Sequence, residues 1–290
     1  MFVITLIANA ERRNLEPALV ESLRNAWGGG DAIWLAPDEA AEFSVSNLPE
    51  NRWNVWQDCQ NLGIDLIALP RENRRKKLLL ADMDSTLIHQ ECIDELAAEA
   101  GFGAMVAQVT AKAMNGEIAF ETAMHERVAV LKDLPISVIT KVLSERITYM
   151  PGGKTLVSTM KSNGAYAALV SGGFTEFTGP VANTLGFDEN RANVLLRDGD
   201  VLSGKVAEPI LGQEAKVEAL QQIVQANNWS TDDVIAVGDG ANDLGMLGLA
   251  GVGVALHAKP AVAAQCDVRI NHGDLTALLY LQGYNRDGFS

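Results

Sequence analysis

The chain has 290 residues, of which 48% are hydrophobic, and its 23 basic and 37 acidic side chains give a formal net charge of −14. This composition is typical of a globular protein with a sizeable core, and it excludes a disordered chain. The acidic balance argues against nucleic acid and anionic membranes as partners, and no stretch reaches the ~18 apolar residues of a membrane-spanning helix.

The first seventy residues predict a small α/β unit. Strands are expected at residues 2–8, 32–35 and 66–69, and a periodic helix is expected at residues 15–26. The three glycines at 28–30 end the helix and lack the Lys-Ser/Thr that would make them a phosphate-binding loop. A basic run at residues 71–77 follows, which we expect to be a solvated linker. We place a domain boundary within this run, so that residues 1–72 form one domain and residues 73–290 a second.

From residue 73 onward, apolar runs alternate with amphipathic helices, a pattern typical of an open parallel sheet whose strands are buried on both faces. The strands are expected at residues 78–81, 165–170, 234–237, 252–255 and 268–270, and the helices at 153–162, 175–185 and 214–227. Residues 193–206 differ, because two short strands flank Asp198-Gly199, a signal for a β-hairpin. The predicted fold class is α/β, with a Rossmann-like parallel sheet core preceded by the small α/β unit.

About eighty residues separate the first two strands of this sheet, far more than an ordinary connection needs. Helical periods fill the gap, at residues 93–100, 104–114, 119–131 and 136–145. We therefore expect an inserted helical cap over about residues 90–150. Such a cap would cover the active edge of the sheet, exclude water and contact the substrate.

Two carboxylates, Asp82 and Asp84, directly follow the strand expected at 78–81. Ligands of open α/β sheets bind at the carboxyl ends of strands, and side chains two residues apart in an extended segment point to the same side. The pair suits either a shared metal ion or a nucleophile beside an acid–base group. By itself an Asp-x-Asp sequence is equally typical of a metal-dependent glycosyltransferase.

A second acidic segment, Gly238-Asp239-Gly240-Ala241-Asn242-Asp243, follows the strand at 234–237. Its glycines allow a tight turn, and Asp239 and Asp243 would share one face if a helix began here. Carboxylates that converge from two strand ends repel one another unless a cation lies between them. Ligands that offer only oxygen favour a hard ion, and Mg²⁺ is the expected one.

Two further features suit an anion. Ser171-Gly172-Gly173 ends the strand at 165–170, and we expect it to begin a helix whose hydroxyl and free N–H groups bind a phosphate. Lys216 falls in the first turn of the helix at 214–227, where the helix dipole disfavours a cation. An exposed lysine and a phosphate contact both remain open for this position.

In this order and spacing, Asp82-x-Asp84-x-Thr86, Ser171, Lys216 and the Gly238–Asp243 segment resemble the four motifs of the haloacid dehalogenase superfamily, and most closely its phosphoserine phosphatase family. The resemblance runs from about residue 76 to the C-terminus. It implies Mg²⁺-dependent hydrolysis of O-phospho-L-serine to L-serine and phosphate through an aspartyl-phosphate intermediate, the last step of serine biosynthesis. In longer members a regulatory unit resembling an ACT fold precedes the enzyme, so residues 1–72 are expected to be ACT-like and regulatory.

The resemblance also implies a role for each motif residue. Asp82 would be the nucleophile, Asp84 the general acid and base, and Lys216 the cation that neutralises the transferring phosphoryl group. The implied metal set is Asp82, Asp84, Asp239 and Asp243, and the implied phosphate contacts are Ser171, Gly172, Lys216 and Asn242. In the cap, the substrate-reading positions are Glu91, Met114, Phe120 and Arg127. Glu91 would bind the ammonium of phosphoserine and Arg127 its carboxylate.

Three alternatives stay open. The same chemistry could act on another small phosphomonoester, which would leave Glu91 and Arg127 idle. A glycosyltransferase would leave Lys216 and the Gly238–Asp243 segment unexplained. A serine-sensing regulator would use the first seventy residues as its binding module. The expected partner is a small phosphomonoester, a homodimer is one candidate assembly, and the three widely spaced cysteines (Cys59, Cys92 and Cys266) indicate reduced thiols and a cytoplasmic location.

Overall fold

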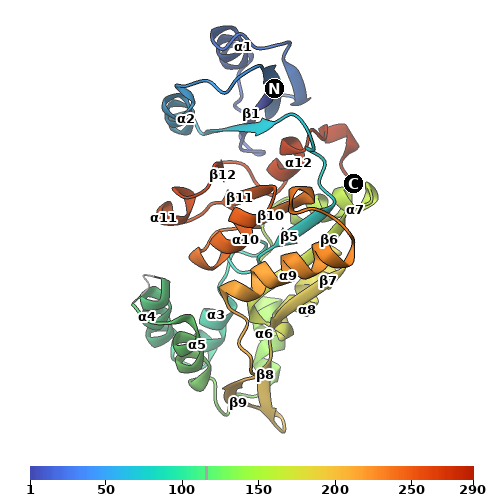
Figure 1. The fold of residues 1–290 in the computed structure, drawn as a ribbon. Helices are drawn as coiled ribbons and strands as arrows, with labels where there is room; N and C mark the ends of the chain where they lie inside the picture. The colour runs from blue at the N-terminus through green and yellow to red at the C-terminus, as the bar shows by residue number, and fades with distance from the viewer. Residues whose placement is uncertain (115–116) are drawn as a thin grey trace.

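The protein is described by a computed structural model that covers residues 1–114 and 117–290 (Figure 1). Its body is a six-stranded sheet of order β12-β11-β10-β5-β6-β7 in which all neighbouring strands pair in parallel. The strands are β5 (Leu78–Ala81), β6 (Tyr166–Phe174), β7 (Glu189–Asn193), β10 (Val234–Gly238), β11 (Val252–Leu256) and β12 (Val268–Ile270). The helices around them are α7 (Gly153–Ser162), α8 (Thr175–Leu185), α9 (Gln213–Ala226), α10 (Leu244–Leu249), α11 (Pro260–Ala263) and α12 (Ala277–Leu281). The predicted α/β class and parallel core are confirmed.

Alternation along β5 shows why its sequence is apolar throughout. Leu78 and Leu80 pack on one face with residues of α9 and α10, whereas Leu79 packs on the other face with residues of α7, α8 and α12. All three leucines are completely buried. A strand covered by helices on both sides has no solvent face that would call for polar residues.

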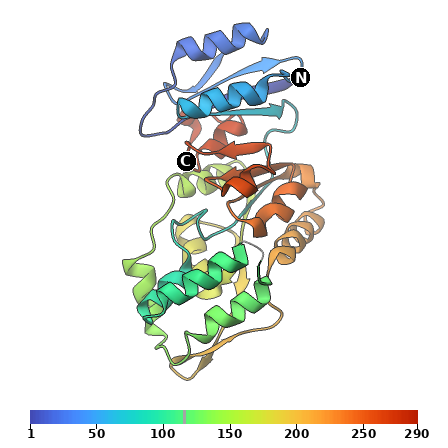
Figure 2. The ribbon, with the colours of Figure 1, turned by 90° about the vertical axis from the view of Figure 1, so that its left-hand side faces the viewer.

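The predicted cap is present as an all-helical insertion after β5. Its helices are α3 (Cys92–Glu99), α4 (Gly103–Met114), α5 (Phe120–Ala129) and α6 (Ser137–Glu145). The predicted hairpin is formed by β8 (Leu195–Asp198) and β9 (Val201–Val206) and lies against this insertion through contacts between β9 and α5. Figures 1 and 2 show the cap at one end of the sheet and the N-terminal unit at the other. No helix in the described ranges is long and apolar enough to cross a membrane.

The N-terminal unit is a four-stranded antiparallel sheet of order β2-β3-β1-β4 with two helices. Its elements are β1 (Phe2–Ala8), α1 (Pro17–Ala26), β2 (Ile33–Ala36), β3 (Ala40–Val45), α2 (Arg52–Asn61) and β4 (Ile64–Pro70). This βαββαβ order is the ferredoxin-like arrangement expected of an ACT-like unit. The sequence did not predict β3 or α2, and the α2 segment has no continuous apolar stripe, since Cys59 is its one fully buried residue.

The two faces of this small sheet have different environments. Ile4 and Leu6 pack under the helices of the unit, whereas Ile7 and Ile67 join the hydrophobic core of the six-stranded body. The N-terminal unit therefore shares a core with the rest of the chain and is not a loosely tethered module.

The prediction of a solvated linker at residues 71–77 is wrong at Arg74 and Lys76, whereas the other five residues of the run are exposed. The Arg74 guanidinium lies 2.6 Å from a carboxylate oxygen of Glu42 and donates to the backbone carbonyl of Leu281. The Lys76 side chain is buried and its ammonium donates to the carbonyl of Asp232 at 2.6 Å. These partners are far away in the sequence. The local sequence therefore shows the charged side chains but does not show which acceptors bind them.

A buried carboxylate forms a second link between the two parts. Asp65 of β4 is fully buried and accepts the backbone N–H groups of Asn271, His272 and Gly273 at 2.8–3.0 Å. Gln60 adds a hydrogen bond to the same carboxylate. Since these N–H groups follow β12, one side chain of the N-terminal unit fixes a loop of the six-stranded body.

We expect Asp65→Asn to lower the free energy of unfolding by about 2–3 kcal/mol, because an amide loses the charge and turns an N–H₂ group toward backbone donors. Urea denaturation followed by circular dichroism measures this change. Asp58→Asn on the exposed surface of α2 is the control and should change stability by less than about 0.5 kcal/mol. Equal effects of the two substitutions would contradict the structural role of Asp65.

Candidate active site

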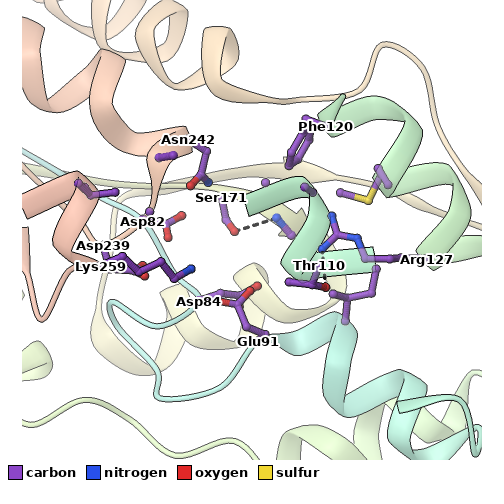
Figure 3. A pocket seen from close by; sticks show the side chains of 18 of the residues that line it. Asp82, Asp84, Glu91, Thr110, Phe120, Arg127, Ser171, Asp239, Asn242 and Lys259 are labelled. Atoms are coloured by element: carbon purple, nitrogen blue, oxygen red, sulfur yellow. Dashed lines mark hydrogen bonds between the residues drawn. The ribbon is translucent and has the colours of Figure 1, made fainter. Parts of the chain in front are cut away.

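A cavity of about 190 Å³ lies between the carboxyl ends of the central strands and the cap (Figure 3). The sheet side contributes Asp82, Asp84, Ser171, Gly172, Asp239, Asn242 and Lys259, and the cap contributes Glu91, Thr110, Phe120, Met124 and Arg127. Parallel pairing of β5 with β10 and with β6 brings these strand ends to one level. The predicted site residues therefore meet although they are up to 160 positions apart in the sequence.

Three buried carboxylates form the centre of the site. One oxygen from each of Asp82, Asp239 and Asp243 lies within 4.8 Å of the others. The ammonium of Lys216 is 2.5 Å from Oδ1 of Asp82 and 2.6 Å from Oδ1 of Asp243. Lys216 is 1% exposed, so the alternative of a solvated lysine is excluded.

The turn after β10 depends on a close approach. Oδ2 of Asp243 accepts the backbone N–H groups of Asp239 and Gly240 at 3.1 and 2.9 Å. A Cβ atom on Gly238 would lie only 2.4 Å from Cγ of Asp243, so this position requires glycine. The helix expected to begin here is a short 3₁₀ turn (Ala241–Asp243) before α10.

The electrostatics of the cluster follow from burial. Burial raises the pKa of Asp239 to about 7, with a further contribution from the charge of Asp243. Burial also raises the pKa of Asp82, against the opposing effect of Lys216. For Lys216, burial lowers the pKa, but the charges of Asp243 and Asp82 outweigh it and the net shift is upward. One lysine does not balance three carboxylates, and oxygen ligands at this spacing fit a hard divalent cation.

Asp84 lies beside the cluster under the start of α3. Burial and, after it, the charge of Glu91 raise its pKa to about 8. Its Oδ1 atom is buried and has no hydrogen-bond partner in the part of the chain that the structure describes. A carboxyl group in this state is protonated at neutral pH and has an oxygen left for a ligand atom.

The segment Ser171–Gly173 does not begin a helix, contrary to the prediction. β6 continues to Phe174, and α8 starts at Thr175. Pairing with β7 shifts register between Val170 and Phe174, which keeps the segment extended where the local sequence favours a turn. Ser171 still lines the cavity, and its Oγ accepts the backbone N–H of Gly173 at 2.9 Å.

Asn193 supports this segment and was not singled out from the sequence. Its amide donates to the carbonyl oxygens of Gly172 and Leu211, and its Oδ1 accepts the N–H of Leu211 at 2.7 Å. The side chain is 2% exposed. Its signal is a polar residue at the end of a strand, and it was missed because β7 itself was not predicted.

The cap residues meet the sheet side in the same cavity. Glu91 accepts the hydroxyl of Ser85 at 2.8 Å, and Arg127 is buried in the cap wall. A Cβ atom on Gly172 would lie 3.1 Å from the ring of Phe120, so the glycine lets this ring close over the cavity. The side chain of Met114 lies outside the described part of the chain. Thr110 and Lys259 also line the cavity and were not predicted.

The family model of haloacid dehalogenase-like hydrolases matches residues 79–248, more than half of the chain. The chain belongs to this family. It is 42% identical over 226 residues to a probable phosphoserine phosphatase of Schizosaccharomyces pombe, which covers 77% of this chain and 76% of that protein. It is 39% identical over 255 residues to a phosphoserine phosphatase of Streptomyces coelicolor, which covers 87% of this chain but 62% of that longer protein.

A solved structure resembles the whole chain, including the N-terminal unit. A haloacid dehalogenase family hydrolase from Salmonella enterica serovar Typhi superposes with a TM-score of 0.86 at 27% identity and covers 97% of both chains. The family membership explains why the motif residues converge as the resemblance implied.

The acidic triad predicts coupled effects of pH and a divalent cation on stability. In metal-free protein the unfolded chain ionises Asp239 near its ordinary pKa of 3.8, whereas the folded state keeps the proton up to about pH 7. Stability should therefore fall as the pH rises through this window. A cation that binds the ionised triad opposes this loss, so Mg²⁺ should raise Tm more at pH 8 than at pH 5.5.

Differential scanning fluorimetry with EDTA or Mg²⁺ at the two pH values measures the effect. Asp239→Asn, which removes one oxygen charge from the triad, should abolish most of the Mg²⁺-dependent rise in Tm. An undiminished rise in this variant would show that the ion binds elsewhere.

Proposed function

We propose that the protein is a Mg²⁺-dependent phosphoserine phosphatase that hydrolyses O-phospho-L-serine to L-serine and phosphate. The observation that carries the proposal is that two different groups of residues, one from the sheet side and one from the cap, line the same cavity. The sheet wall holds Asp82 and Ser171, with Lys216 bonded to Asp82 behind the wall, and these residues suit a phosphoryl group; the cap wall holds Glu91 and Arg127. Opposite charges on the cap suit the ammonium and the carboxylate of a small amino acid. The names of the relatives agree with this activity.

In the first step, Asp82 attacks phosphorus and forms an aspartyl-phosphate while the bond to the serine oxygen breaks. Asp84 gives its proton to the departing oxygen, a role that its raised pKa and its unpartnered oxygen support. In the second step, Asp84 takes a proton from the water that attacks the aspartyl-phosphate, and phosphate leaves. Asp82 and Asp84 are thereby both restored.

The other residues bind and orient. Asp82, Asp239 and the backbone carbonyl of Asp84 would hold Mg²⁺, with Asp243 beside them, and the bound ion would neutralise charge on the phosphoryl oxygens. Lys216 adds a positive charge next to the nucleophile and holds its carboxylate in place. Ser171, the N–H of Gly172 and Asn242 would contact the phosphate, and Phe120 and Met114 would shield the site from water.

We also propose that residues 1–72 form a separate domain, that residues 73–290 form the phosphatase domain and that the cap spans about residues 90–150. The family match supports the division, since it begins at residue 79, and so does the separate antiparallel sheet of β1–β4. A regulatory role of the first domain, homodimer formation and a cytoplasmic location stay predictions.

Phosphate release from matched esters tests the substrate. We expect kcat/KM for O-phospho-L-serine to exceed that for O-phosphoethanolamine, which lacks the carboxylate, and for 3-phosphoglycerate, which has a hydroxyl in place of the ammonium. The preference should be about 100-fold for each, since each analogue leaves Glu91 or Arg127 without its oppositely charged partner inside the cavity. EDTA should abolish turnover and Mg²⁺ restore it. Equal rates for the three esters would leave a general phosphatase and would refute the roles of Glu91 and Arg127.

Asp82→Asn tests the nucleophile. We expect kcat to fall by at least about 1,000-fold, because the amide cannot form the acyl-phosphate. Acid quenching of the wild-type protein during turnover, followed by peptide mass spectrometry, should find the phosphate on the peptide that contains Asp82. Asp198→Asn in the exposed β8–β9 hairpin is the control and should keep full activity. Substantial turnover by the Asp82→Asn variant would refute the covalent route.

A further inference from the structure

Arg127 reaches the cavity from the cap helix α5. It is 7% exposed, and its Nε donates to the carbonyl of Ala123 at 3.1 Å. Its Nη1 donates to Oγ1 of Thr110 at 3.4 Å. Within residues 1–114 and 117–290, Nη2 makes no hydrogen bond, and no carboxylate lies within 4.0 Å of the guanidinium. Figure 3 shows the guanidinium beside Thr110, on the opposite side of the cavity from Asp82.

Thr110 connects Arg127 to a negative charge. Thr110 lies on α4, is 6% exposed and lines the cavity. Its hydroxyl donates to Oδ1 of Asp94 on α3 at 3.2 Å. A hydroxyl has one proton to donate and two lone pairs, so this bond turns a lone pair of Thr110 toward Arg127. Three cap helices are thus joined through one side chain.

The hydroxyl also determines what Arg127 can bind. A direct pair between Asp94 and Arg127 would use the two parallel N–H groups that a carboxylate ligand needs. With Thr110 between them, Asp94 compensates the positive charge from a distance and leaves those N–H groups open. Burial lowers the pKa of Arg127, and the charge of Asp94 is the largest influence that opposes this shift.

We propose that Thr110 and Asp94 are positioning residues that hold the Arg127 guanidinium for the substrate carboxylate and so set the preference for amino-acid phosphate esters. The inference rests on the proposed function, because it assigns the carboxylate of phosphoserine to Arg127. Neither residue touches the reacting atoms. The effect of losing them should therefore appear in substrate binding and not in the chemical step.

Thr110→Val tests the inference, since valine keeps the shape of threonine and removes the hydroxyl. We expect KM for O-phospho-L-serine to rise about tenfold, with kcat changed less than about twofold. A tenfold rise corresponds to the loss of one hydrogen bond to a charged group. KM for O-phosphoethanolamine, which offers no carboxylate, should stay within about twofold of the wild type. Thr110→Ser should restore the wild-type KM because it returns the hydroxyl.

Two further variants separate positioning from packing. In an Arg127→Ala background, Thr110→Val should add nothing to KM, since its effect passes through the missing guanidinium. Thr178→Val is the matched control: Thr178 is fully buried on α8, and its hydroxyl donates to Asn190 at 2.8 Å away from the cavity. It should lower Tm but keep the ratio of the two KM values. If Thr110→Val does not fold, Asp94→Asn tests the same ratio, because it keeps the acceptor oxygen and removes the charge.

The results distinguish two failures. A wild-type protein that hydrolyses both esters equally well would overturn the proposed function and this inference with it. A wild-type protein that prefers phosphoserine, together with a Thr110→Val variant that keeps the preference, would overturn the inference alone. Equal loss on both esters, or full additivity with Arg127→Ala, would show that Thr110 only shapes the cavity and would also overturn it.

Discussion

The site depends on a salt bridge that is almost completely buried. Lys216 lies between Asp82 and Asp243, and all three side chains are less than 7% exposed. Such burial is costly unless every charge has a close partner, and here the two carboxylates bound to Lys216 lie within 4.8 Å of a third, that of Asp239. The residual negative charge at the strand ends is the physical basis for cation binding. It is tolerated because apolar strands on either side hold the cluster rigidly.

Sheet and cap divide the charges of the site between them. The sheet supplies the carboxylate cluster, whereas the cap supplies Arg127 together with the acid Glu91. The Phe120 ring bridges the two, because it packs against glycine backbone at Gly172 and Gly212. The Phe120 ring can therefore close over the cavity only because positions 172 and 212 are glycines, which have no side chains to block it. The two units are nonetheless coupled, because the charge of the cap residue Glu91 contributes to the raised pKa of Asp84.

Features that depend only on neighbouring residues, such as a buried strand and the carboxylates that follow it, could be predicted from the sequence. β5 and β10 are apolar because both faces are covered, and the sequence places Asp82, Asp84, Asp239 and Asp243 directly after these two strands, where the structure brings them close together. Pairing between distant segments could not be predicted. The extended Ser171 segment depends on its register with β7, and the roles of Asn193 and Thr110 depend on partners in other elements. The role of such a polar residue becomes clear only when its hydrogen-bond partners in the folded protein are known.

The same limitation explains the error at the basic run after β4. Arg74 appears solvated in the sequence but binds Glu42 and the end of α12, and Asp65 binds the loop after β12. The same loop also contacts a segment near the cavity, because the carbonyl of Gly273 lies 2.8 Å from Nε2 of His257. His257 is two residues before Lys259, which lines the cavity. The N-terminal unit and the site therefore share structural support through a short chain of hydrogen bonds.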